Sequence, residues 1–119
     1  MTLRAIDRAK AHFKQLVDSP IEIRVPEWDV DGDEFIIYAT PLTLQDRVTL
    51  TRNNPNQLEM AANILILKAK DKDGNLLFGK EDKPDLMRAA SSSVIKRISE
   101  AIVDGSNADE AAIEQAEKN

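Results

Sequence analysis

The first apolar pattern along the chain has the period of an α-helix. Over about residues 3–18, large apolar side chains recur at intervals of three and four positions, which places them on one face of a helix. The dipeptide Ser19-Pro20 ends this pattern, because a residue that precedes proline is displaced from helical geometry. The sequence therefore predicts an amphipathic N-terminal helix, whose apolar stripe is Leu3, Ile6, Phe13, Leu16 and Val17.

The pattern then changes to the two-residue period of β-strands. Residues 21–25 alternate apolar and charged side chains, and residues 35–40 are β-branched and aromatic. Asp31-Gly32 between them is a hairpin turn signal, and Pro26 belongs at a strand end or edge because it has no amide hydrogen. We therefore expect an antiparallel hairpin whose apolar face packs on the N-terminal helix.

Helical signals dominate the middle of the chain. Thr43 and Asp46 have the spacing of a capping box, which predicts a short helix to about Arg52. Asn54 as N-cap begins a second helix over about residues 55–70, which is the least polar and is expected at the centre of the core. The apolar positions of this second helix are Leu58, Ala61, Ala62, Ile64, Leu65, Leu67 and Ala69.

The last third predicts a capped helical turn at Asp82 and then an amphipathic helix after the serines at 91–93. Gly105 holds the position that commonly ends a helix. Residues 106–119 are rich in Ala and Glu, which favours either a helix that does not dock or a mobile segment. The prediction is one α+β domain over residues 1–105 with a C-terminal tail over 106–119: an N-terminal helix, a β-hairpin or small antiparallel sheet, and a mainly helical C-terminal half.

Composition then restricts the chemistry. The chain has 119 residues, a formal net charge of -5, no cysteine and one histidine, His12. Disulfides, thiolate metal sites, cysteine nucleophiles and multi-histidine sites are therefore excluded. An acidic chain also lacks the surplus of Lys and Arg that a general nucleic-acid binder needs. We expect no catalytic residue, no cofactor and no metal, and a role in binding or assembly.

Two acidic turns were tested against the calcium-binding EF-hand loop. With Gly74 at the sixth loop position, Ala69 and Lys80 fall at the first and twelfth, where the loop requires oxygen ligands. With Gly32 at the sixth position, Tyr38 falls at the twelfth. The sequence favours ordinary turns formed by Asp and Gly.

Other features have a structural and a functional interpretation. The basic face of the first helix is interrupted by Asp7 and Asp18, which favours a solvated face over a nucleic-acid or lipid contact. Trp28 is either a partner anchor or a packing residue of the hairpin. The longest apolar stretch, residues 60–67, is far below the ~20 residues that span a bilayer, so we expect no membrane and a cytoplasmic location. The basic residues of that first face are Arg4, Arg8, Lys10 and Lys14.

Five segments, in their order and spacing, resemble a known family. They are MTLRAIDRAKAHF (1–13), IEIRVPEW (21–28), IYATPLTL (37–44), ILILKAKDKDG (64–74) and FGKEDKPDLMR (78–88). Together they are similar to the tail assembly chaperones of long, non-contractile-tailed bacteriophages. The resemblance covers most of residues 1–103.

The resemblance implies a non-enzymatic protein of the infected host's cytoplasm that is absent from the finished virion. Such proteins coat the tape measure protein, keep it soluble and recruit the major tail protein to the growing tube. The family often also makes a longer form of the protein by frameshifting. A coat on a rod needs many copies, so we expect self-association. The alternative is a small regulatory or DNA-binding module of a phage or bacterium.

A partner-binding surface is expected on the later helices. Its candidate residues can equally complete the core, and the sequence leaves that choice open. They are Leu86, Met87, Ile95, Ile98 and Ile102, with Trp28 as a separate candidate anchor.

Overall fold

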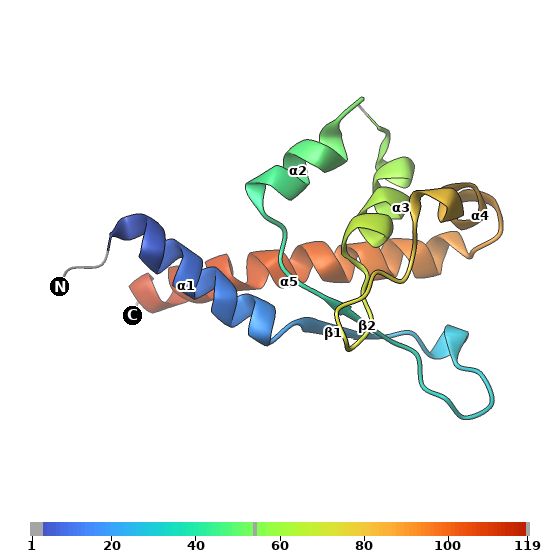
Figure 1. Cartoon of the computed structure of the whole chain (residues 1–119), viewed down its shortest axis with the longest axis horizontal. Helices are drawn as coiled ribbons and strands as arrows, with labels where there is room; N and C mark the ends of the chain where they lie inside the picture. Colours follow the sequence, from blue (N-terminus) through green and yellow to red (C-terminus); the bar gives the residue numbers. More distant parts are fainter. Residues whose placement is uncertain (1–3, 54, 119) are drawn as a thin grey trace.

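The computed structural model describes the backbone of residues 4–53 and 55–118, and the side chains of residues 4–53 and 55–105. It confirms the α+β class, with an N-terminal helix, a two-stranded antiparallel sheet and a mainly helical C-terminal half (Figure 1). The elements in chain order are α1 (Ala5–Asp18), β1 (Ile21–Arg24), the 3₁₀-helix η1 (Pro26–Trp28), β2 (Ile36–Ala39), α2 (Leu44–Thr51), α3 (Gln57–Lys68), the 3₁₀-helix η2 (Lys80–Asp82), α4 (Lys83–Arg88) and α5 (Ser92–Lys118).

The core forms where α5 meets α3 and β1. Ile98 and Ile102 of α5, Leu65 of α3 and Ile37 of β2 are completely buried, so the two halves of the chain share one apolar cluster. α3 contacts α2, α4 and α5, and its buried residues are Ala62, Ile64, Leu65 and Lys68, so the expected core position is confirmed for the part of the helix from Ala62 onward. The buried hydrophobic residues are Ile23, Val25, Ile37, Ala39, Leu50, Ala62, Ile64, Leu65, Ala69, Leu86, Val94, Ile95, Ile98 and Ile102.

The hairpin follows its predicted turn chemistry. β1 and β2 pair antiparallel, with Ile21 opposite Ala39. Asp31 and Gly32 have φ values of 48° and 84°, and positive φ at both central positions is what a type I′ turn requires. Val30 and Asp33 exchange backbone hydrogen bonds of 3.2 and 2.8 Å across this turn. The Asp-Gly signal is therefore confirmed.

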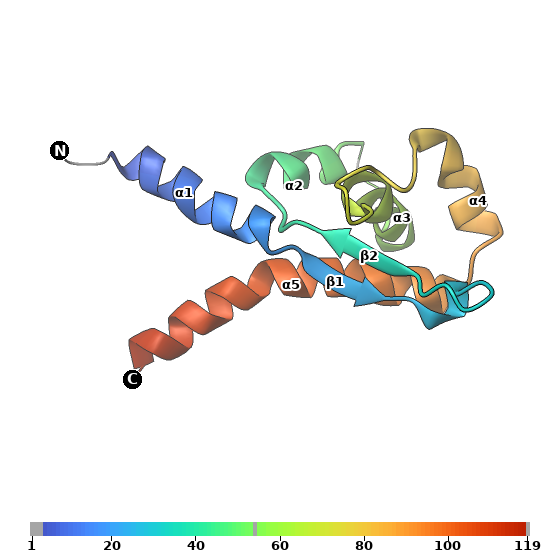
Figure 2. The same ribbon diagram turned by 60° about the horizontal axis from the view of Figure 1, so that its bottom comes forward.

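The expected packing of the hairpin on α1 is wrong. β1 contacts α5, and α1 has no buried residue; Ile6 is 49% exposed and Val17 40% exposed. α1 leaves the body at the end opposite α4 (Figures 1 and 2). The physical reason is that α5 already contacts β1 and shares one apolar cluster with both strands, so the stripe of α1 has no place in this core.

Local caps begin both middle helices. α2 begins where predicted, and α3 begins two residues later than predicted. The capping box is confirmed: Thr43 Oγ1 accepts from the Asp46 amide at 3.0 Å, and Asp46 Oδ2 accepts from the Thr43 amide at 2.9 Å. α3 begins at Gln57 because the N-cap is Asn56, whose side chain accepts from the Glu59 amide at 2.8 Å. The predicted cap, residue 54, lies outside the described residues.

Gly105 does not end the last helix, so that prediction is wrong. The backbone of α5 continues to Lys118. A Cβ added at Gly105 would overlap the side chain of Ile21, because the start of β1 lies directly against this turn of α5. Gly105 therefore serves close approach between strand and helix, and the tail extends the helix.

One carboxylate joins α2 to α3. Besides capping α2, Asp46 Oδ2 lies 3.0 Å from Nζ of Lys68, whose side chain is only 8% exposed at the end of α3. Partial burial raises the pKa of Asp46, but hydrogen bonds from Thr43 and from the Lys68 ammonium outweigh burial, and the pKa lies below its ordinary value.

Asp46→Ala should lower the free energy of unfolding by about 3–5 kcal/mol, because it leaves a buried ammonium without its partner. Urea unfolding followed by circular dichroism measures the loss, and Glu22→Ala, which removes an exposed carboxylate, is the control. Because the folded pKa lies below the ordinary 3.8, the contribution is complete above that pH and is lost as pH falls through the folded pKa. A gap between wild type and Asp46→Ala that stays constant in acid would contradict this assignment.

A matched pair of isoleucines tests the position of α1. Ile98→Ala should cost about 2–5 kcal/mol of unfolding free energy through lost burial and a cavity. Ile6→Ala, on the exposed stripe of α1, should change it by no more than about 0.5 kcal/mol. Equal losses in urea denaturation would mean that α1 belongs to the core.

Candidate functional site

An open apolar groove runs between α3, α4 and α5. Its volume is about 490 Å³. Two large apolar side chains stand at its rim, Leu58 at 68% exposure and Met87 at 43%. The lining also includes Met60, Leu86, Ile95 and Val103.

The rim residues follow from helix geometry. Successive residues on a helix point about 100° apart, so the burial of Leu86 in the core turns the next residue, Met87, outward. Leu58 lies in the first turn of α3, directly after the capped end. The burial of Leu86 fixes the backbone that carries Met87, and the Asn56 cap fixes the backbone that carries Leu58. Both side chains border the groove without filling it.

The candidate partner-binding residues divide into three groups. Ile98 and Ile102 are completely buried and do not line the groove, so the interpretation that they complete the core holds for them. Leu86 and Ile95 are buried but contribute to the groove wall. Met87 alone combines exposure with a place in the groove.

Sequence reasoning missed Leu58. Its apolar spacing within α3 assigned it to the core, yet it is 68% exposed. The usable signal was its position in the first turn after an Asn cap, ahead of the apolar stretch that begins at Met60. A residue in the first turn of a helix can lie on the same face as the buried residues and still extend past the ends of the neighbouring helices.

Trp28 packs within the hairpin. Its ring meets Phe35 and Phe78 edge to face, with centroid distances of 5.5 and 6.1 Å and interplanar angles of 73° and 71°. These are favourable aromatic geometries. Trp28 is only partly exposed and is not among the groove residues, so its contacts are those of a packing residue.

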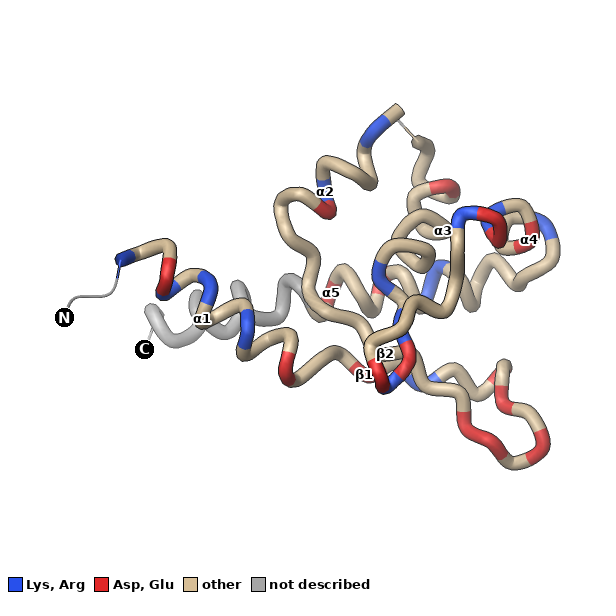
Figure 3. Tube along the Cα trace, in the orientation of Figure 1, with Lys and Arg blue, Asp and Glu red and all other residues tan. Residues whose placement is uncertain are grey.

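Charges are distributed unevenly over the molecule (Figure 3). Basic side chains follow α1, and acidic ones gather at the hairpin turn. Arg4, Arg8, Lys10 and Lys14 are all exposed, as expected for a solvated helix face, and the side chain of His12 is exposed beside them.

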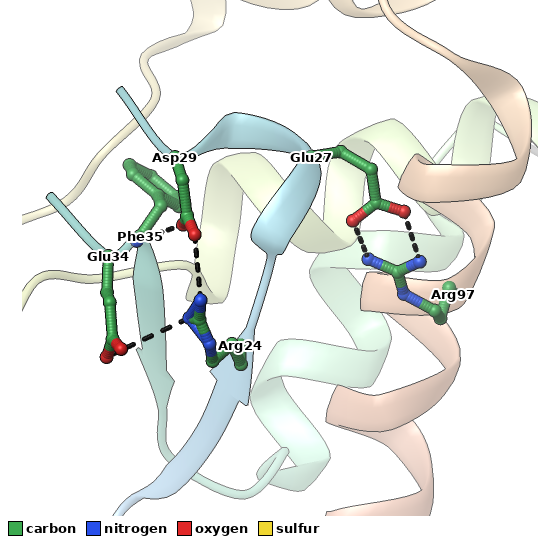
Figure 4. Close-up of polar contacts among 6 residues, drawn as sticks. All are labelled: Arg24, Glu27, Asp29, Glu34, Phe35 and Arg97. Atoms are coloured by element: carbon green, nitrogen blue, oxygen red, sulfur yellow. Dashed lines mark hydrogen bonds and ion pairs between the residues drawn. The ribbon is translucent and has the colours of Figure 1, made fainter. Parts of the chain in front are cut away.

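The carboxylates around the hairpin turn make structural contacts (Figure 4). Glu27 accepts two hydrogen bonds from Arg97 of α5, at 2.6 and 2.7 Å, and this pairing lowers the pKa of Glu27 to about 2. Asp29 accepts from the Phe35 amide at 2.8 Å and from Arg24 at 2.7 Å. Arg97 and Arg24 therefore fasten the turn to α5 and to β1.

The second acidic turn is held by its own backbone. Asp71 Oδ1 accepts from the amides of Asp73 and Asn75 at 2.9 and 3.0 Å, and the Asn75 amide is the main cause of a lowered pKa at Asp71. Across the described part of the chain, His, Cys, Asp and Glu form no group of three or more that could hold a metal ion.

The groove offers apolar contact with a slightly acidic rim. Its charged residues are Lys96, Glu100 and Asp104, all exposed, and Lys96 Nζ lies 3.9 Å from Glu100 Oε1. A wall of this chemistry suits one face of an amphipathic helix, whose apolar side chains enter while its polar side chains stay in water.

No family model, curated protein or solved structure matches the chain. Among the helices that the structure describes, none has the length and apolar content needed to cross a membrane.

Substitutions at the groove should show which of its residues belong to the surface and which belong to the core. Met87→Asp and Leu58→Asp should each change the free energy of unfolding by about 1 kcal/mol or less, because the new charge remains in water. Ile95→Asp, which buries a charge without a partner, should cost several-fold more. Chemical denaturation checks this, and a large loss at Met87 or Leu58 would show that the rim is part of the core.

Proposed function

We propose that the protein is a non-enzymatic phage tail assembly chaperone and that the groove between α3, α4 and α5 binds its client, the tape measure protein. The observation that carries the proposal is the pair of exposed apolar side chains, Leu58 and Met87, at the rim of an apolar groove. The resemblance of five segments to tail assembly chaperones is the reason for proposing this client.

The chemistry of the groove suits such a client. A tape measure protein is a long helical rod, and apolar stripes that are exposed before the tube encloses them drive aggregation. An amphipathic helix laid in a groove buries its stripe at anchors spaced three or four residues apart. Met87 is unbranched and flexible, which lets one site accept varied apolar side chains.

The net charge gives the complex its solubility. With a formal net charge of -5, each bound copy adds negative charge to the rod, and mutual repulsion keeps coated rods apart. In this scheme several copies coat the rod in the host cytoplasm, a frameshifted longer form works with them, and the major tail protein displaces the coat as the tube grows. The chaperone then leaves before the virion is complete.

The alternative, a regulatory or DNA-binding module, has weaker support. The exposed basic residues at the start of α5 are Lys96 and Arg97, and Arg97 is engaged by Glu27. Recognition of DNA needs several basic side chains directed at phosphates from one face. Strong retention on heparin at low salt would favour this alternative.

Coexpression with the cognate tape measure protein tests the proposal. Wild-type chaperone should keep the client in the soluble fraction and copurify with it, whereas Leu58→Asp combined with Met87→Asp should lose most of both effects. Leu44→Asp is the matched control, because Leu44 is 84% exposed on α2 and lies outside the groove. Full protection of the client by the double variant, or equal failure of the control, would refute the groove as the client site.

A further inference from the structure

The amphipathic helix α1 places an apolar stripe in solvent. None of its residues is buried, and Phe13 and Leu16 are only half-buried while Ile6 and Val17 are exposed. A 14-residue helix is marginal in water without packing of its apolar face. This helix therefore has a face that needs a partner.

The charge on α1 is opposite to that of the remaining chain. Residues 4–18 carry four basic and two acidic side chains, a net of +2, against -5 for the whole chain, which leaves -7 elsewhere. Another copy of the same chain is thus an electrostatically complementary surface. Within the groove, the exposed carboxylates of Glu100 and Asp104 outnumber the single cation, Lys96.

We propose that α1 of one copy occupies the α3–α4–α5 groove of a second copy. Phe13 and Leu16 enter between Leu58 and Met87, while Lys10 and Lys14, which lie four residues apart on one flank of the stripe, approach Glu100 and Asp104. The inference rests on the proposed function, because it makes α1 the occupant of the client groove before a client arrives. Self-association and client binding then compete for one surface.

The position of α1 favours a second copy over its own groove. α1 joins the body through Ser19-Pro20 and points away at the end opposite α4, which forms one wall of the groove (Figure 2). Each copy therefore has an arm at one end and a groove towards the other. A contact between unlike surfaces of this kind is heterologous and continues from copy to copy, as a ring or an open chain.

Mass measurement on the full-length protein without any client tests the inference. In sedimentation velocity, wild type should form oligomers that grow with concentration. Phe13→Asp, which spoils the arm, and Met87→Asp, which spoils the groove, should each be monomeric. Leu44→Asp, which alters neither surface, should assemble like wild type.

Mixing the two monomeric variants gives the decisive result. Phe13→Asp retains an intact groove and Met87→Asp retains an intact arm, so an equimolar mixture should form heterodimers and stop there. A mixture that stays monomeric would overturn the arm-in-groove contact. A wild type that is monomeric at every concentration would also overturn the contact. This holds whether α1 is then found to cover its own groove or to bind anionic phosphatidylglycerol vesicles.

A charge exchange tests the polar part of the contact. Lys10→Glu with Lys14→Glu should weaken self-association about tenfold or more, and adding Glu100→Lys with Asp104→Lys should restore it. If the quadruple variant associates as weakly as the double variant, the proposed pairing of charges is overturned.

Client binding is read separately. Phe13→Asp, whose grooves are vacated in every copy, should retain the client at least as well as wild type. Loss of self-association with retained client binding supports both proposals. Normal arm-in-groove assembly of a protein that fails to protect the client would refute the client alone.

Discussion

The fold depends on the burial of one stripe of α5, on which Ile98 and Ile102 lie fully enclosed. α3 covers this helix from one side and β1 from another, and the Glu27–Arg97 pair fastens the hairpin turn to the same helix. The sheet has only two strands, and an isolated hairpin of this size is marginal in water. Without α5, the sheet would lose the helix that β1 contacts.

Features whose cause lies within a few residues could be predicted from the sequence. The hydrogen bonds of the Thr43–Asp46 capping box and the backbone angles of the Asp31-Gly32 turn involve only residues close together in sequence. The local sequence is therefore enough to predict them. The partner of the hairpin could not be predicted, because two amphipathic helices far apart in sequence compete to cover it. Gly105 was misjudged for a similar reason, since the contact that requires glycine comes from Ile21.

The candidate site shows the same division. Apolar spacing marks the segment that holds Met87 and Ile95, which line the groove, but spacing alone does not distinguish a residue of the groove wall from one buried beneath it. Ile98 and Ile102 lie under the neighbouring elements, whereas Leu58 lies beyond them at the start of α3. Exposure depends on where neighbouring helices end, and that is a property of the assembled core. The groove forms only where three helices pack together, so it could not be predicted from the spacing within any one helix.

The place of α5 at the end of the described chain sets the order of events during synthesis. β1 leaves the ribosome long before the helix that covers it: Ile23 precedes Ile98 by 75 positions. At the usual rate of 5–20 residues per second, the strand waits roughly 4–15 s for its cover. α1 emerges earlier still, with its apolar stripe exposed. The apolar side chains of β1 therefore stay open to contact with other polypeptides until the residues of α5 have been made.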